Sequence, residues 1–141
     1  MLRGLRPLGG LTRLSSPCRG GGAFAAFRGG AGSERVMLRI YATVIEVLGM
    51  LRPVLVRIES RDRDLARQLR RAASSVALNV SEGSGSRGGT RRERYHNALG
   101  SARETGACLD VAEALGYIGG VDARLRDALD HVRATLTKNV V

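Results

Sequence analysis

Apolar residues recur every three or four positions along four stretches of this chain, which is the period of a helix with one buried face. The first stretch begins at Met37. Its main row holds Tyr41, Val44, Leu48, Leu51, Leu55 and Ile58, and a second row beside it holds Ile40, Val47 and Val54. Pro53 falls inside this pattern. Because proline lacks an N–H and crowds the preceding turn, we expect it to kink the helix or to split it.

A second helix is expected from Arg61 to Val80, with Ser60 as the N-cap of its first turn. Its inward face carries Leu65, Leu69, Ala72, Val76 and Val80. By the 100° helical increment the opposite face carries Arg63, Arg67, Arg70 and Arg71. The Gly- and Ser-rich residues 81–89 then predict a loop.

Two further helices follow this loop. Thr90 and Glu93 have the spacing of a capping box, which predicts a third helix from Thr90 to about Leu115, ended by Gly116. A fourth helix is expected over residues 122–138. The inward faces hold Tyr95, Ala98, Ala102, Leu109 and Ala112 in the third helix and Leu125, Leu129, Val132 and Leu136 in the fourth. The sequence therefore predicts an all-α fold, an antiparallel up-down-up-down four-helix bundle over residues 37–139.

Several apolar residues lie outside these inward rows. Leu78 points outward on the second helix, and Cys108, Val111 and Leu115 lie away from the main stripe of the third. Two interpretations are open: a wide stripe that faces the core, or a second apolar face that mediates self-association. We favour self-association.

Residues 1–36 show no sustained helical or strand period. They are rich in Gly, Arg and Ser, and residues 1–33 contain five arginines and no acidic residue. Three interpretations are open: a disordered basic leader, a targeting peptide, or a stretch that is not translated, with Met37 as the true start. The last is favoured, because the helical pattern begins at Met37.

The net charge of +10 directs attention to acidic partners, nucleic acid first, although an Arg-rich composition also follows from GC-rich coding. The candidate nucleic-acid contacts are Arg63, Arg67, Arg70, Arg71, Arg87, Arg91 and Arg92. No aromatic residue interleaves with them, so we expect contacts to the RNA or DNA backbone rather than base stacking. The interspersed acids Asp62, Asp64 and Glu93 favour the alternative of a merely solvated, salt-bridged face.

Catalytic and metal chemistry find little support in the sequence. Glu93 and His96 have the E-x-x-H spacing of a di-iron helix, but His131 has no Glu three residues before it. Residues 83–89 do not match a phosphate-binding G-x-x-x-x-G-K-[ST] loop, and neither cysteine has a CxxC partner. We expect no enzyme activity, no metal and no cofactor. Because no disulfide framework is expected, we take a reducing cytoplasm as the default location. No apolar run reaches the roughly 18 residues that a transmembrane helix needs, so we expect no membrane partner.

Residues 68–83, QLRRAASSVALNVSEG, resemble the hallmark of the bacterial four helix bundle protein family, also called the 23S ribosomal RNA intervening-sequence protein family. Residues 98–104, ALGSARE, and residues 114–118, ALGYI, are similar to its second hallmark. The resemblance covers about residues 37–138. It implies a four-helix bundle, with relatives that assemble into closed rings, notably pentamers. A related branch, the accessory variability determinants of diversity-generating retroelements, binds nucleic acid and a reverse transcriptase.

The residues that these hallmarks contribute at the second loop are Asn79, Glu82, Gly83, Ser101 and Glu104. In an antiparallel hairpin the two segments face each other. We favour a hydrogen-bonded network that caps the second helix and fixes its register against the third, with Gly83 at positive φ. The alternative is a functional site.

Together these patterns predict a non-enzymatic, homo-oligomeric four-helix bundle protein that binds RNA or DNA through arginine-rich surfaces. The resemblance implies a ring, for example a pentamer. The related branch also makes a reverse transcriptase a candidate protein partner. The alternative function is a protein–protein interaction scaffold with no nucleic-acid role.

Overall fold

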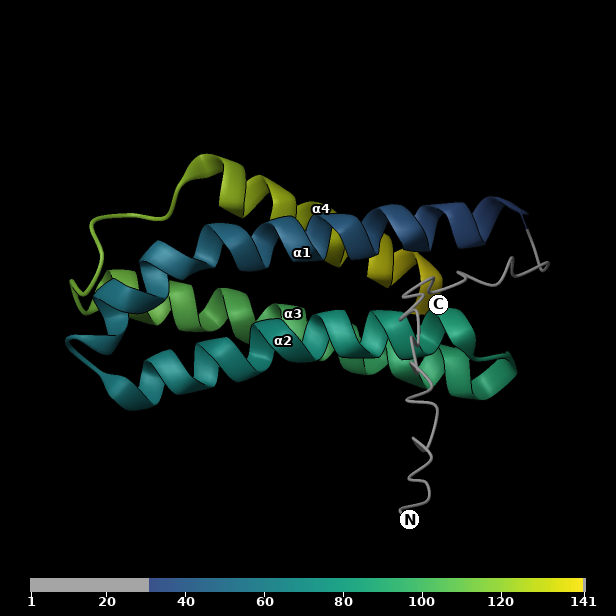
Figure 1. Cartoon of the computed structure of the whole chain (residues 1–141), viewed down its shortest axis with the longest axis horizontal. Helices are drawn as coiled ribbons and strands as arrows, with labels where there is room; N and C mark the ends of the chain where they lie inside the picture. Colours follow the sequence, from purple (N-terminus) through teal and green to yellow (C-terminus); the bar gives the residue numbers. More distant parts are fainter. Residues whose placement is uncertain (1–30, 141) are drawn as a thin grey trace, which may run out of the picture.

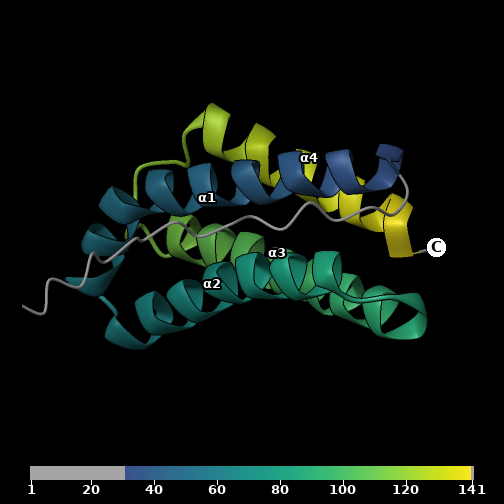
Figure 2. The same cartoon turned by 45° about the vertical axis from the view of Figure 1, so that its right-hand side comes forward.

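A computed structural model describes residues 31–140, which form four helices and, within that range, no strand (Figure 1). The helices are α1 (Ala31–Glu59), α2 (Arg63–Gly85), α3 (Gly88–Ala114) and α4 (Ala123–Val140). The predicted all-α class is confirmed. Each helix contacts the next one along the chain, and α1 also contacts α4, so the four surround one core (Figure 2). These contacts fit the predicted antiparallel up-down-up-down order.

The first helix begins at Ala31 rather than at Met37, so residues 31–36, assigned above to the leader, are helical. Residues 1–30 of that leader lie outside the described residues. Pro53 does not split the helix, which continues through it to Glu59. Both ribbon views show the last turns of α1 bending toward α2, as a proline inside a helix would favour (Figures 1 and 2).

The second helix is capped by Asp62, and the prediction of Ser60 as its N-cap is wrong. The Asp62 carboxylate accepts hydrogen bonds from the backbone N–H groups of Asp64, at 3.0 Å, and Leu65, at 2.9 Å. A carboxylate here also interacts favourably with the helix dipole. Ser60 instead donates its hydroxyl to the carbonyl oxygen of Arg57, at 2.8 Å, at the end of α1.

The predicted loop over residues 81–89 is largely helical. α2 continues to Gly85 and α3 begins at Gly88, so only Ser86 and Arg87 connect them. Thr90 lies inside α3, and the predicted capping box is therefore wrong.

Close packing at Gly83 explains this difference. Gly83 is buried within α2, where an added Cβ would lie 2.4 Å from Cε1 of Tyr95, a buried ring on α3. Glycine is therefore required at this position because α2 and α3 pack closely, and not because the chain turns there. The prediction of positive φ at Gly83 is wrong, whereas Gly88, the first residue of α3, has φ +59°.

The end of α3 follows the prediction. Gly116 has φ +69°, the left-handed conformation that glycine adopts without steric cost. Its N–H donates to the carbonyl oxygen of Glu113, at 3.0 Å, and the N–H of Tyr117 donates to that of Ala112, at 2.9 Å. These two bonds satisfy carbonyl groups that the helix end would otherwise leave unpaired.

The predicted inward rows of α2, α3 and α4 are buried, except Leu65, which is half-buried. The first helix is rotated relative to the prediction. Its buried row is Met37, Ile40, Val44, Val47, Leu51 and Ile58, whereas Tyr41 is exposed and Leu48, Val54 and Leu55 are half-buried.

The outlying apolar residues divide into two groups. Leu78, Val111 and Leu115 are exposed, as predicted. Cys108 is buried with only 4% of its surface exposed, so for this residue the wide stripe that faces the core is correct and the favoured second apolar face is wrong.

We predict that Gly83→Ala destabilises the bundle by about 1–3 kcal/mol, the usual cost of overpacking, because the added Cβ would overlap the buried ring of Tyr95. The matched control is Gly100→Ala on α3, where an added Cβ meets nothing within 4 Å and alanine is the better helix former. Urea unfolding followed by circular dichroism measures both. An unchanged midpoint for Gly83→Ala would contradict this account of the α2–α3 contact.

Candidate nucleic-acid interface

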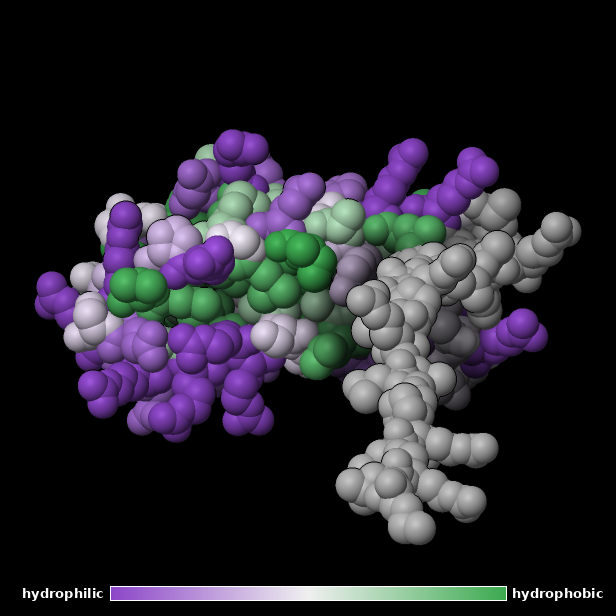
Figure 3. Space-filling view, in the orientation of Figure 1, coloured by the Kyte–Doolittle hydropathy of each residue, from purple (hydrophilic) through white to green (hydrophobic). Residues whose placement is uncertain are grey.

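Four arginines form one exposed surface on the N-terminal half of α2. This arginine surface comprises Arg63, Arg67, Arg70 and Arg71. Their spacing of three and four residues keeps them on the side of the helix that faces away from the core. Figure 3 shows hydrophilic side chains crowded over this end of α2.

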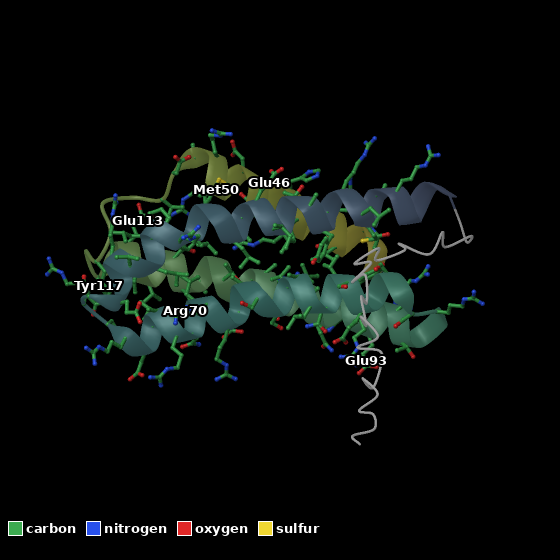
Figure 4. The ribbon with its side chains drawn as sticks, viewed as in Figure 1. Glu46, Met50, Arg70, Glu93, Glu113 and Tyr117 are labelled. Carbon is green, nitrogen blue, oxygen red and sulfur yellow. The ribbon has the colours of Figure 1, made fainter. Side chains whose placement is uncertain are left out.

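Few acidic groups neutralise the arginine surface. Arg67 lies 3.4 Å from Asp64, and Arg70 lies 3.4 Å from Glu59, on the side of α2 toward α1 (Figure 4). All four of these side chains are at least half exposed, and exposed ion pairs of this kind contribute less than about 1 kcal/mol. Arg63 and Arg71 form no ion pair with any described residue. The positive charge is therefore available to a partner.

The other predicted arginines lie at the opposite end of α2. From position 67 to position 87 the chain rises by roughly 30 Å, at 1.5 Å per helical residue, so the predicted contacts form two separate groups. Arg91 donates its Nε–H to the carbonyl oxygen of Ser86, at 2.8 Å, and Arg92 donates its Nε–H to that of Val140, at 2.7 Å. Arg87 is the cap residue of α3. Arg91 and Arg92 therefore tie chain segments together at this end.

A polar groove runs between α2 and α3 beside the arginine surface. It consists of two adjoining hollows, of 410 Å³ and 550 Å³, that share Ser75, Ser101 and Glu104. Arg67 and Arg71 line the first hollow, on its α2 side. We call this feature the α2–α3 groove.

Hydrogen bonds between hydroxyl and amide groups form the floor of the groove. Ser101 donates its hydroxyl to the hydroxyl of Ser75, at 2.9 Å. The side-chain amide of Asn79 donates to the same Ser75 hydroxyl, at 3.1 Å, and to the Ser75 carbonyl oxygen, at 2.9 Å. Asn79 and Ser101, which were predicted to associate, are thus linked by the Ser75 hydroxyl that both contact.

The remaining hallmark residues make separate contacts. Gln68 donates its amide to Oε1 of Glu104, at 3.2 Å, and Arg94 forms an ion pair with Glu82, at 3.0 Å. As residue numbers rise along α2, those of the α3 partners fall, which is the pattern of antiparallel neighbours. These contacts fix the register of the two helices. At the C-terminal end of α2, the backbone N–H of Ser86 donates a hydrogen bond to the carbonyl oxygen of Gly83. This bond, rather than a hallmark side chain, caps the helix.

Two groove residues, Gln68 and Ser75, were not among the residues predicted from the sequence. Together with Asn79 they recur at spacings of seven and four, so they lie on one flank of α2. The sequence signal that could have identified them is this row of polar residues at helical spacing beside the buried apolar row of α2.

Two observations on the described residues bear on chemistry near the groove, the state of the Cys108 thiol and the arrangement of metal-ligating side chains. Burial, and secondarily the charge of Glu104, raises the pKa of the Cys108 thiol, so this thiol stays protonated and unreactive. No group of three or more His, Cys, Asp or Glu side chains in residues 31–140 is placed to hold a metal ion. None of the helices in that range is both long and apolar enough to cross a bilayer.

Comparison with protein families gives one match, to the family described as 23S rRNA-intervening sequence protein, over residues 55–138. The matched region is more than half of the chain and includes the arginine surface and the α2–α3 groove. Comparison with curated proteins and with solved structures finds no match.

We predict that Ser101→Ala lowers the free energy of unfolding by about 0.5–1.5 kcal/mol, since it removes the hydroxyl bond between α2 and α3. A double-mutant cycle with Ser75→Ala, measured by urea unfolding, isolates the pair. The two changes should be less than additive, because either one breaks the same bond. Strict additivity would show that the pair contributes nothing to the register.

Proposed function

The chain belongs to the 23S rRNA-intervening sequence protein family, and we propose that it is a non-enzymatic homo-oligomer that binds RNA or DNA through the arginine surface. The observation that carries this proposal is the concentration of four exposed arginines on one face of α2, with only two weak ion pairs among them. Arginine suits phosphate because its planar guanidinium donates two parallel hydrogen bonds.

The contacts of this surface are with the nucleic-acid backbone. Each arginine that neutralises a phosphate releases a condensed counterion, so the affinity falls steeply as salt is added. Arg91 and Arg92 already donate to backbone carbonyls, and we assign them a secondary part in binding.

An apolar stripe on α1 supports the homo-oligomeric part of the proposal. This α1 stripe comprises Leu38, Tyr41, Ile45 and Val56, which are 50%, 39%, 45% and 68% exposed. The first three recur at helical spacing and share one flank of α1 with Leu48. Figure 3 shows apolar surface along α1 on the side where α2 carries its arginines. Burial of this stripe between copies would bring several arginine surfaces into one particle, for which a closed ring such as a pentamer is the expected form.

The same stripe favours the alternative function, a scaffold for a protein partner such as a reverse transcriptase, with no nucleic-acid role. Leu78, Val111 and Leu115 add exposed apolar area on α2 and α3. In that case the arginines serve solubility, and polynucleotides would not bind.

We predict that the triple variant Arg67→Ala, Arg70→Ala and Arg71→Ala binds structured RNA and duplex DNA at least tenfold more weakly than the unchanged chain at about 50 mM salt. The slope of log K against log salt should also become less steep by about one for each phosphate that the protein no longer neutralises. Gel shifts across a salt series measure both quantities.

The matched control is Arg39→Ala, Arg103→Ala and Arg124→Ala, which removes the same charge from exposed positions on α1, α3 and α4. Equal weakening in both triple variants would mean that net charge alone drives association. A folded protein that binds no polynucleotide at low salt would exclude the nucleic-acid function and leave the scaffold.

We predict that Ile45→Glu reduces the molar mass in solution to that of one chain, because it places charge at the centre of the α1 stripe. Light scattering after size exclusion measures this, and circular dichroism checks that the bundle stays folded. Glu46→Gln, on the neighbouring exposed position, is the control. If the unchanged chain itself has the molar mass of a monomer, the homo-oligomer is ruled out.

A further inference from the structure

We propose that the α2–α3 groove holds one unpaired nucleotide of the bound nucleic acid and selects guanine. This inference rests on the proposed function and adds base recognition to it. The groove supplies three things that a nucleotide needs: arginine side chains on the α2 wall, a carboxylate acceptor on the α3 wall, and a stretch of bare backbone one helical turn from that carboxylate.

Each wall carries charge of both signs, but Arg67 pairs with Asp64 and Arg94 pairs with Glu82. Among the described residues that line the groove, the charged groups that remain without an ion pair are Arg71 on α2 and Glu104 on α3. Both line the same hollow, yet no ion pair joins them. Glu104 uses one oxygen to accept from the Gln68 amide, and a carboxylate has capacity for further donors on both oxygens. A ligand with an anion at one end and N–H donors at the other would satisfy both walls. A nucleotide, with its phosphate and base edge, is such a ligand.

Gly100 supports a ligand in this position. It lies in the middle of α3, where glycine costs about 1 kcal/mol relative to alanine. At the buried glycines of α2 and α3 an internal group fills the space, the Tyr95 ring at Gly83 and the Arg133 guanidinium at Gly106. At Gly100 an added Cβ meets nothing within 4 Å, so no contact inside the described structure requires glycine there. Gly100 lines the groove, where its bare backbone admits a flat ring.

The carboxylate of Glu104 determines which base is preferred. Guanine presents two adjacent N–H donors on its Watson–Crick edge, which match the two oxygens of a carboxylate. Adenine and cytosine present one amino donor beside an acceptor, and uracil presents one N–H between two carbonyls, so each would bring an acceptor toward Glu104. The edge is free only in an unpaired base, so a loop or single strand is required.

The test is fluorescence anisotropy of the full chain with short oligouridine probes that carry one central guanosine, inosine or adenosine. At physiological salt we expect the guanosine probe to bind about tenfold more tightly than the adenosine probe, as a two-bond base contact gives, with inosine between them because it lacks the 2-amino group. Glu104→Gln should abolish this preference, since its amide places a donor against the base.

A second variant separates binding from folding. Gly100→Leu fills the groove from an exposed helical position, so we expect at least tenfold weaker guanosine binding with no fall in the unfolding temperature. Ala134→Leu, on the exposed part of α4, is the control and should bind as the unchanged chain does.

Equal binding of all three probes, with weaker binding in the arginine triple variant, would overturn the groove inference and leave the proposed function intact. A guanine preference that survives Glu104→Gln would overturn it as well. Absence of binding to any polynucleotide at low salt would overturn both.

Discussion

The ring of Tyr95 rests on the backbone of Gly83, and the rest of the α2–α3 pair is arranged around this contact. Any side chain at position 83 would push the helices apart. Because they are close there, α2 extends to Gly85, two residues suffice for the connection, and Ser75 meets Ser101 within hydrogen-bonding distance. The α2–α3 groove is the outer surface of this close contact, so its shape follows from a glycine that takes no part in binding.

The distribution of acidic side chains determines which arginines remain available. Arg126 on α4 forms ion pairs with both Asp110 and Glu113, which directs the acids at the C-terminal end of α3 toward α4. They are thus engaged away from α2, whose arginine surface lies at the same end of the bundle. Arg133 likewise pairs with Asp130 on its own helix and donates to a carbonyl of α3. Acidic side chains of α3 are thus paired with α4, and the arginine surface of α2 keeps its positive charge.

Helical periodicity predicted the all-α class and the buried rows of α2, α3 and α4, because burial repeats with the helix turn. The composition of residues 81–89 predicted a loop, which is wrong. Composition cannot distinguish a glycine required for close helix packing from a glycine required for a turn. Ser60 and Asp62 are both acceptable caps, and only the path of the chain decides between them. The candidate arginines lie close together in the sequence, but the length of α2 separates them in space into two groups. The groove depends on pairs such as Gln68 and Glu104 that meet only after folding.

The two-residue connection between α2 and α3 also bears on how the chain folds. Closing a short loop costs less chain entropy than closing a long one, and the α2–α3 pair has the most extensive contacts of any two helices. Local contacts of this kind favour rapid folding. We therefore expect the α2–α3 hairpin to form early in the folding of the bundle.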